Sequence, residues 1–358
     1  MAKNKNTNPL LERLRAISKI PEADSLEDSK ILGDPEMVAT EVPMINVALS
    51  GQWDGGLASG STILAGPSKH FKTSFGLLMA AAYLKKHKDS IILFYDSEFG
   101  SPKSYFQSFG IDASRVFHVP ITNIEQLKFD LVAQLSALKR GDKVVIMVDS
   151  IGNLASVKEV EDALKESSKA DMTRAKALKS LFRMITPLLK LKDIPLISIA
   201  HIYMTQEMFS KPIVSGGTGL YYSSDNIWII GRRQDKDDEG VQGYHFIINV
   251  DKSRFVKEKS KIPVSVSWEG GIQRSSGLLD IALEGGYLIK PKNGWYAPYN
   301  PTTKKEIGKA TKEDNTKDMS FWQPIIDETD FKAYVEKRYR MSTSDMLKTA
   351  PVIDPDEE

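Results

Sequence analysis

The segment that most constrains this chain is Ala65–Ser74, with the sequence Ala-Gly-Pro-Ser-Lys-His-Phe-Lys-Thr-Ser. An apolar run, Ser61–Ala65, precedes it, and a helical sequence, Lys72–His87, follows it. Strand, glycine-containing turn and helix are the context of a P-loop, in which backbone N–H groups and the helix N-terminus hold phosphate oxygens. The segment therefore predicts a nucleotide site with ATP and Mg²⁺ as cofactors, contacted by Gly66, Pro67, Ser68, Lys69, His70, Phe71, Lys72, Thr73 and Ser74.

Within this motif, we expect Lys72 to reach the terminal phosphates and the Thr73 hydroxyl to ligate Mg²⁺. The general motif has a second glycine before the lysine, and this chain has Phe71 there. The expectation is that Phe71 has a helical φ, which tolerates a side chain, and that its ring points away from the phosphates.

Two acidic residues at strand ends strengthen the prediction. The apolar strand Lys143–Asp149 ends in a carboxylate, which is the arrangement that holds the metal beside a P-loop, so we assign Asp149 to nucleotide and Mg²⁺ binding. The strand Ile91–Asp96 is followed by Glu98. Because ligands gather at the carboxyl ends of strands in open α/β sheets, Glu98 is placed to orient a water molecule for attack on the γ-phosphate.

Alternating strands and helices define the expected fold. Apolar runs of strand length separated by helical segments predict an α/β fold with a mostly parallel central sheet covered on both faces. We expect a small N-terminal helical arm over residues 1–30, a core that contains the predicted ATP site over 31–275, and a C-terminal region over 276–358. That region should contain a poorly ordered loop over 292–320, a helix over 331–341 and an acidic tail. The further expected strands are Ile194–Ala200, Asn226–Ile230, Tyr244–Asp251 and Pro263–Trp268.

The arm carries Leu10, Leu11, Leu14, Ile17 and Ile20 at helical spacing, which predicts a short amphipathic helix. Two interpretations remain open. The helix caps its own domain, or it docks on a neighbouring copy of the chain.

Composition excludes several classes of protein. The chain has no cysteine, so disulfides, thiolate catalysis and cysteine metal sites are excluded. No apolar run approaches the ~20 residues of a membrane helix, and the N-terminus leads into no signal sequence, so we expect neither a membrane partner nor secretion. The net charge is +1, but basic residues concentrate in 169–192 and 252–261. A nucleic-acid partner would therefore meet one face of the protein.

Several segments resemble a known family. Gly55–Leu57, the P-loop, Tyr95–Glu98 and Gly216–Gly219 follow one another in the order of RecA-type recombinases. The resemblance covers about residues 40–297 and is closest to phage members of the family, which also have a phenylalanine before the P-loop lysine. The stretches that carry it are Pro43–Ser50, Ala65–Lys72, Asp171–Lys176, Gln206–Lys211 and Lys290–Tyr296.

This resemblance implies a DNA-dependent ATPase that assembles as a helical filament on single-stranded DNA and exchanges strands with homologous double-stranded DNA. It further implies a phage single-stranded-DNA-binding protein and a recombination mediator as partners, and the cytoplasm of a bacterial host as the location.

Five residues receive roles from the resemblance. Glu98 matches the catalytic glutamate, and Tyr105 matches an aromatic that stacks on adenine; an alternative for Tyr105 is a helix residue packed on the core. His201 falls where RecA has a glutamine that senses the γ-phosphate, and its alternative is a strand-end histidine that only packs. Lys252 and Arg254 match a basic pair that reaches the ATP of the adjacent protomer, and we expect them at alternate positions of one strand.

Two segments are candidate DNA-binding loops: 150–173, which leads into the basic helix ending at Lys192, and 202–220, which is rich in Gly and Ser. Contacts to phosphates hold DNA without reading its sequence, and an aromatic side chain can stack on bases. The basic helix has a second interpretation as a solvated face. The expected contacts are Arg174, Lys176, Arg183, Phe209, Lys211, Gly216 and Gly217.

Two other functions fit parts of the sequence. A ring helicase shares the ATPase core, but the chain lacks the large N-terminal domain that such helicases often have, and Gly216–Gly219 favours a recombinase. A filament mediator without ATPase activity is supported only by Phe71, against Lys72, Thr73, Glu98 and Asp149.

Overall fold

A computed structural model describes residues 8–165, 173–206, 210–237 and 240–341. The chain divides into two compact units, the first formed by Met1–Ala39 and Leu57–Ile230, the second by Thr40–Gly56 and Gly231–Glu358. This grouping differs from the three regions expected from the sequence, whose boundaries stay a prediction.

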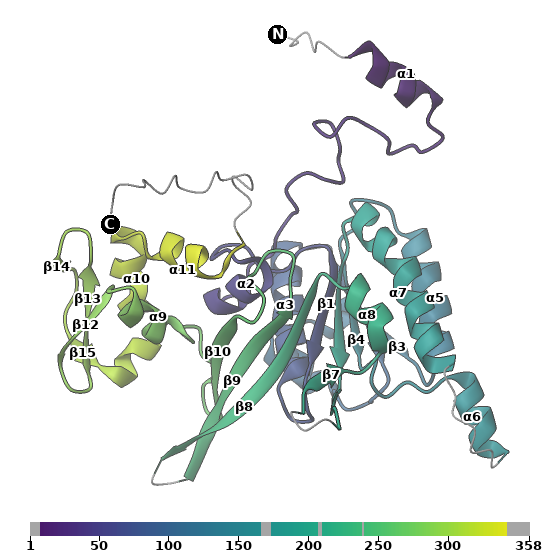
Figure 1. The fold of residues 1–358 in the computed structure, drawn as a ribbon. Helices are drawn as coiled ribbons and strands as arrows, with labels where there is room; N and C mark the ends of the chain where they lie inside the picture. Colours follow the sequence, from purple (N-terminus) through teal and green to yellow (C-terminus); the bar gives the residue numbers. More distant parts are fainter. Residues whose placement is uncertain (1–7, 166–172, 207–209, 238–239, 342–358) are drawn as a thin grey trace, which may run out of the picture. The chain divides into compact units, whose positions relative to one another are not determined.

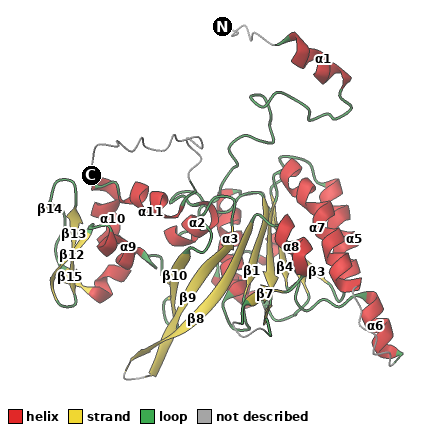
Figure 2. Ribbon diagram, in the orientation of Figure 1, coloured by secondary structure: helices red, strands yellow, loops and turns green. Residues whose placement is uncertain are grey.

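The first unit is built on a parallel sheet, as the apolar runs predict. Its strand order is β8–β1–β5–β4–β2–β3, and every pair with a described register is parallel (Figures 1 and 2). Parallel pairing brings the carboxyl ends of β2 and β4 to one edge, with Asp96 opposite Asp149. The strands are β1 (Gly60–Ala65), β2 (Ile91–Asp96), β3 (Val116–Pro120), β4 (Val144–Asp149), β5 (Pro195–Ala200) and β8 (Asn226–Asp237), of which Asn226–Ile230 lies in this unit.

Helices cover both faces of this sheet. On one face, α5 (Ile124–Ala137) and α7 (Thr173–Lys192) bury their leucines and Phe182 against alternate residues of the strands. On the other face, α3 (Lys72–Lys86) approaches closely at Gly76, where an added Cβ would lie 2.9 Å from Met147 Cε. The sheet is thus buried on both sides, which explains why its strands read as unbroken apolar runs.

Shorter elements connect this frame. They are α1 (Pro9–Ile17), α4 (Lys103–Ser108), the 3₁₀ turn η1 (Ala113–Arg115), α6 (Val157–Leu164), α8 (Gly217–Ser223) and the hairpin of β6 (Ile202–Met204) with β7 (Pro212–Val214). The predicted N-terminal helix is present as α1, and none of its residues is buried. Both interpretations of this helix, a cap on its own domain and a contact with a neighbouring copy, stay predictions.

The second unit contains helix α2 (Pro43–Ser50) and two groups of strands. The later residues of β8 continue into the order β8–β9–β10–β11, in which β9 and β10 are antiparallel. The second group is a small antiparallel sheet in which β13 pairs with β12, β14 and β15. The elements are β9 (Gly240–Lys252), β10 (Lys261–Ser267), β11 (Gly271–Ile272), α9 (Leu278–Glu284), β12 (Leu288–Lys292), β13 (Trp295–Asn300), β14 (Lys305–Glu306), β15 (Thr311–Lys312), η2 (Glu313–Lys317), α10 (Met319–Glu328) and α11 (Phe331–Tyr339).

The expectation of a poorly ordered loop over 292–320 was wrong. The segment forms strands β13, β14 and β15 and the turn η2. The fully buried Trp322 donates its indole N–H to Thr316 O at 2.7 Å, which ties the end of the segment to α10. The Lys, Asn and Thr residues that suggested a loop lie mostly on exposed hairpin positions, while Tyr296 and Ala297 face inward.

A charged cluster in the first unit gives a testable pH dependence. The Glu36 carboxylate lies 2.7 Å from Lys143 Nζ and 3.1 Å from Lys86 Nζ. Partial burial raises the pKa of Glu36, but the two ammonium groups outweigh burial and lower it from the ordinary 4.5 to about 2. A lowered folded-state pKa means that the ionised group stabilises the fold above the unfolded pKa, and that this stabilisation is lost as pH falls through the folded pKa.

We therefore expect Glu36→Gln to lower the urea midpoint near neutral pH and to differ progressively less from wild type as pH falls from 4.5 towards 2. The exposed Glu161 on α6 provides the control substitution, Glu161→Gln. Urea unfolding followed by circular dichroism across this range measures both. A midpoint difference that is the same at neutral and at acidic pH would show that the ion pairs do not contribute through ionisation.

Candidate functional site

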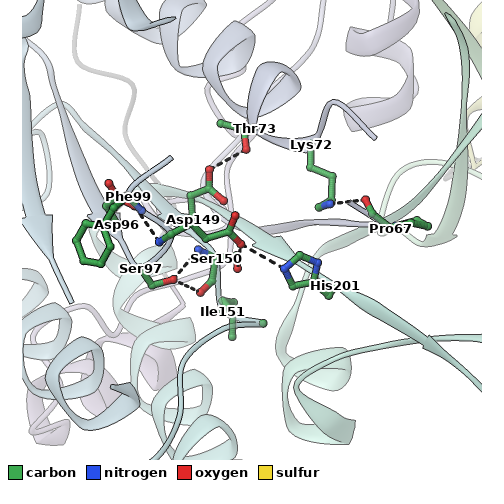
Figure 3. A network of polar contacts seen from close by, with 12 residues as sticks. Pro67, Lys72, Thr73, Asp96, Ser97, Phe99, Asp149, Ser150, Ile151 and His201 are labelled. Atoms are coloured by element: carbon green, nitrogen blue, oxygen red, sulfur yellow. Dashed lines mark hydrogen bonds and ion pairs between the residues drawn. The ribbon is translucent and has the colours of Figure 1, made fainter. Parts of the chain in front are cut away.

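The predicted P-loop connects β1 to α3 in the first unit. Gly66 N–H donates to Ala200 O at 3.3 Å, which joins the start of the loop to the end of β5. Lys72 is buried and its ammonium donates to Pro67 O at 2.7 Å, so the lysine folds back over the loop (Figure 3). Burial lowers the pKa of Lys72, and the nearby carboxylates of Glu98 and Asp149 oppose that shift. The lysine therefore sits where a bound anion would replace its backbone partner.

Phe71 is the N-cap residue of α3, and the expectation of a helical φ was wrong. Its φ is +56°, in the left-handed region that a glycine at this position would adopt without cost. A left-handed conformation costs a residue with a side chain of order 1 kcal/mol or more. The ring packs against Phe75, with centroids 6.4 Å apart. The direction of the ring relative to bound phosphates stays a prediction.

Thr73 and Asp149 come together as the two sequence motifs predict. The Thr73 hydroxyl donates to Asp149 Oδ2 at 2.7 Å and links the start of α3 to the end of β4 (Figure 3). Burial raises the pKa of Asp149 to about 6, with further upward contributions from Glu98 and Asp96 that Thr73 and Lys72 partly oppose. A buried carboxylate whose pKa is perturbed by burial and by neighbouring charges marks a candidate functional site.

The second oxygen of this carboxylate tests the fit of Mg²⁺. Asp149 Oδ1 is buried and has no hydrogen-bond partner among the described residues. Hard cations such as Mg²⁺ bind through one or two carboxylate oxygens together with phosphate oxygens and water. No group of three or more acidic or histidine side chains in the described ranges could hold a metal alone. Thr73 and Asp149 therefore fit a Mg²⁺ ion that arrives with a phosphate ligand.

Glu98 stands at the adjacent strand end and is held by two side chains at one oxygen. Ser150 Oγ donates to Glu98 Oε1 at 2.5 Å, and His201 Nε2 lies 3.2 Å from the same oxygen. The backbone is also fixed, because Asp96 Oδ1 accepts from the N–H groups of Glu98 at 3.1 Å and Phe99 at 2.8 Å. One oxygen of the carboxylate is thus oriented by protein, and among the described residues no side chain holds Oε2, which can accept from a water molecule.

Ser150 and Ser97 form a further connection that sequence reasoning missed. Ser97 Oγ donates to Ser150 O at 2.8 Å and accepts from Ser150 N–H at 2.9 Å. Ser150 is fully buried directly after Asp149, so the acid that ends β4 and the loop that carries Glu98 are joined at one residue. The Asp-Ser pair at the end of an apolar strand was the available signal.

Tyr105, assigned to adenine stacking, lies in α4 beside the start of α3. Its hydroxyl forms a hydrogen bond with Ser74 Oγ, and its ring packs edge-on against Phe109 at 5.7 Å between centroids. The structure therefore brings Tyr105 to the P-loop helix. The stacking role and the packing role both remain compatible with this position.

The predicted DNA contacts fall in several environments. Lys176 and Arg183 are exposed on α7, and Lys211 is exposed at the start of the β7 side of the hairpin. Gly216 and Gly217 have φ of +124° and +75° and begin α8, whose Gly219 lies so close to α7 that an added Cβ would be 2.8 Å from Lys179 Cα. Phe209 lies outside the described residues.

Arg174 has a role that the sequence did not indicate. Its guanidinium is half-buried and donates to Leu154 O at 2.7 Å, Ile151 O at 3.0 Å and Gly152 O at 3.1 Å. The residue therefore fixes the loop that follows β4. Contact with DNA by Arg174 stays a prediction.

Lys252 and Arg254 lie in the second unit. Lys252 is the last residue of β9, whereas Arg254 is exposed in the turn beyond it. The expectation that both occupy alternate positions of one strand was wrong for Arg254, because the strand ends before Ser253, whose hydroxyl accepts from the N–H groups of Phe255 and Val256 and turns the chain. Their contribution to a neighbouring protomer stays a prediction.

In the described ranges, no helix has the length and apolar character needed to cross a membrane.

Comparison with known proteins places this site in a family. The model of the RecA N-terminal domain matches residues 26–273, and that of the bacteriophage T4 recombination and repair protein, C-terminal domain, matches 275–335. The recombination and repair protein of Enterobacteria phage T4 is 49% identical over 326 residues, covering 89% of this chain and 83% of that protein. The RecA protein of Bacteroides thetaiotaomicron is 27% identical over 271 residues, covering 75% and 78%, and that of Streptomyces ambofaciens is 26% identical over 265 residues, covering 73% and 68%. The chain therefore belongs to the RecA family, within the group that includes the phage T4 recombination and repair protein.

Proposed function

We propose that this protein is an ATP-dependent DNA strand-exchange recombinase that forms helical filaments on single-stranded DNA. The observation that carries the proposal is the meeting of Lys72, Thr73, Asp149 and Glu98 at one edge of a parallel sheet, in a chain 49% identical to the phage T4 recombination and repair protein. Its proposed partners are homologous double-stranded DNA, further copies of the chain, a phage single-stranded-DNA-binding protein and a recombination mediator. The bacterial host cytoplasm is its proposed location.

Each group of the site has its own role in ATP hydrolysis. Loop N–H groups and Lys72 bind the phosphates, and the Thr73 hydroxyl and Asp149 carboxylate hold Mg²⁺. When bound, Mg²⁺ neutralises charge that develops on the phosphate oxygens. Glu98 orients a water molecule and accepts its proton, while Ser150 and His201 fix the other carboxylate oxygen. Positioning of this kind supplies much of the catalysis in phosphoryl transfer.

His201 is the proposed link between nucleotide and DNA. It follows β5 directly and precedes β6, and Ser215 N–H donates to His201 O at 2.8 Å, which closes the base of the β6–β7 hairpin. We therefore expect a change at His201 to reach both strands of the β6–β7 hairpin, which lies within the candidate second DNA loop. Loss of a γ-phosphate releases switch segments in other nucleotide-binding proteins, and the same physical change would act here.

Replacement of the P-loop lysine tests the nucleotide site. Lys72→Ala should reduce DNA-stimulated ATP turnover by at least about 100-fold, because preorganised positive charge on the transferring phosphoryl group is lost. Lys139→Ala, at an exposed position outside the site, is the control and should keep normal turnover. Phosphate release with and without single-stranded DNA measures both, and circular dichroism checks the fold. Normal turnover by Lys72→Ala would contradict the assignment.

A mixing experiment tests the proposal that Lys252 and Arg254 act on the ATP of an adjacent protomer. Subunits in a filament meet head to tail, so a mixture of Lys72→Ala and Arg254→Ala chains contains some junctions with one intact site. We expect the mixture to recover part of the ATPase activity that each variant lacks alone. Absence of recovery, with co-assembly confirmed by electron microscopy, would show that the site is not shared.

The proposed His201 link is tested by DNA affinity in two nucleotide states. Couplings of this kind are typically worth about 5- to 150-fold in affinity. His201→Ala should still bind ATP but lose most of the difference in single-stranded DNA affinity between an ATP analogue and ADP. The measurement is made at fixed salt, because phosphate contacts depend on salt. An unchanged affinity ratio in the variant would remove His201 from the switch.

A further inference from the structure

The His201 ring lies against a glycine that has no room for a side chain. An ideal Cβ on Gly152 would lie 2.3 Å from His201 Cδ2, 3.1 Å from Cγ and 3.3 Å from Cβ. The φ of Gly152 is outside the left-handed region, so its backbone does not require glycine. The requirement is for space, because the imidazole occupies the volume that a side chain would fill.

The same edge of the ring reaches the proposed catalytic glutamate, because Cδ2, the atom nearest to Gly152, is bonded to Nε2. His201 Nε2 lies 3.2 Å from Glu98 Oε1, the oxygen that also accepts from Ser150. Gly152 therefore forms one wall of the space in which the imidazole lies, and Glu98 contacts the ring atom next to the one that lies against this wall. A ring displaced from Gly152 by even an ångström would alter the contact with Glu98.

The loop that contains Gly152 is held by hydrogen bonds from strand β5 and from helix α7. Ile151 N–H donates to Ile199 O at 2.9 Å, which fixes the loop to β5, the strand that His201 follows. Arg174 reaches the loop from α7 and donates to the carbonyls of Ile151, Gly152 and Leu154. A guanidinium presents several N–H donors in a rigid fork, so one side chain can hold these three carbonyls in a fixed relation.

From these contacts we propose that Gly152 and Arg174 are positioning residues for ATP hydrolysis. Arg174 holds the 151–154 loop, Gly152 leaves the space for the imidazole, and His201 in turn orients Glu98. The proposal rests on the proposed function, in which Glu98 acts on the attacking water. It also connects the N-terminal turn of the basic helix α7 to the Glu98 carboxylate. The connection consists of three contacts, Arg174 with the loop, Gly152 with His201, and His201 with Glu98.

The substitution Gly152→Ala tests whether the His201 imidazole needs the space that the glycine leaves. The added methyl group should displace the ring and lower kcat for ATP on saturating single-stranded DNA by about 10- to 100-fold, the scale of a misplacement of about 1 Å, with little change in KM. Gly33→Ala is the matched control, because Gly33 has no atom within 4 Å of an added Cβ and no left-handed φ.

The double variant Gly152→Ala/His201→Ala separates positioning from damage to the fold. If the methyl group acts through the imidazole, Gly152→Ala should cause no further loss of kcat in a His201→Ala background, because the clashing ring is absent. Equal losses from Gly152→Ala in both backgrounds, or a kcat for Gly152→Ala equal to that of Gly33→Ala, would overturn the proposal.

NMR spectroscopy follows the His201 ring directly and does not depend on ATPase activity. The chain has five histidines, so the imidazole resonances of His201 are assigned by comparing wild type with His201→Ala. In the nucleotide-free protein without DNA, Gly152→Ala, Arg174→Ala and Arg174→Lys should each shift these resonances, because a lysine ammonium cannot reproduce the guanidinium fork. Unchanged His201 resonances in the Arg174 variants would remove Arg174 from the proposal. A wild-type protein without ATPase activity would contradict the proposed function and leave this measurement valid.

Discussion

The hydrogen bond between Thr73 and Asp149 joins the start of helix α3 to the end of strand β4, the two elements that carry the predicted phosphate and Mg²⁺ ligands. Thr73 belongs to the first turn of α3 and Asp149 to the end of β4, and they are 76 positions apart in the chain. The parallel sheet brings them together because β1 and β4 flank β5 and end at the same edge. Without that register, the lysine of the loop and the buried carboxylate would not share one site.

The other polar groups of the site lie at the ends of the neighbouring strands β2, β4 and β5. Asp96 lies opposite Asp149 in the register of β2 and β4, and it fixes the backbone of Glu98 and Phe99. Ser150 then connects the end of β4 to Glu98, and His201, after β5, reaches the same oxygen. Three neighbouring strand ends thus contribute one polar network, in which Asp96, Asp149 and Ser150 are buried and Glu98 and His201 are partly exposed.

The sequence predicted the parallel sheet, the P-loop and the pairing of Thr73 with Asp149, because these depend on local pattern and on one rule of topology. It did not predict the roles of Ser150 or Arg174, since a serine after an acid and an arginine in a basic helix have many uses. The left-handed Phe71 was missed for a different reason: a residue with a side chain rarely adopts that conformation, and only tertiary structure imposes it. The strands after Trp295 were missed because their polar residues face solvent and resemble a loop.

The conformation of Phe71 changes how the phosphate loop is prepared for its ligand. A glycine at this position would sample both signs of φ, and ordering it would consume free energy when the nucleotide binds. Phe71 by itself prefers a negative φ, so packing in the folded protein must impose the left-handed conformation, and the contact with Phe75 holds the residue against the first turns of α3. The strain is thus borne during folding and balanced by packing, so the shape of the loop before α3 depends on side chains of the helix as well as on the loop itself.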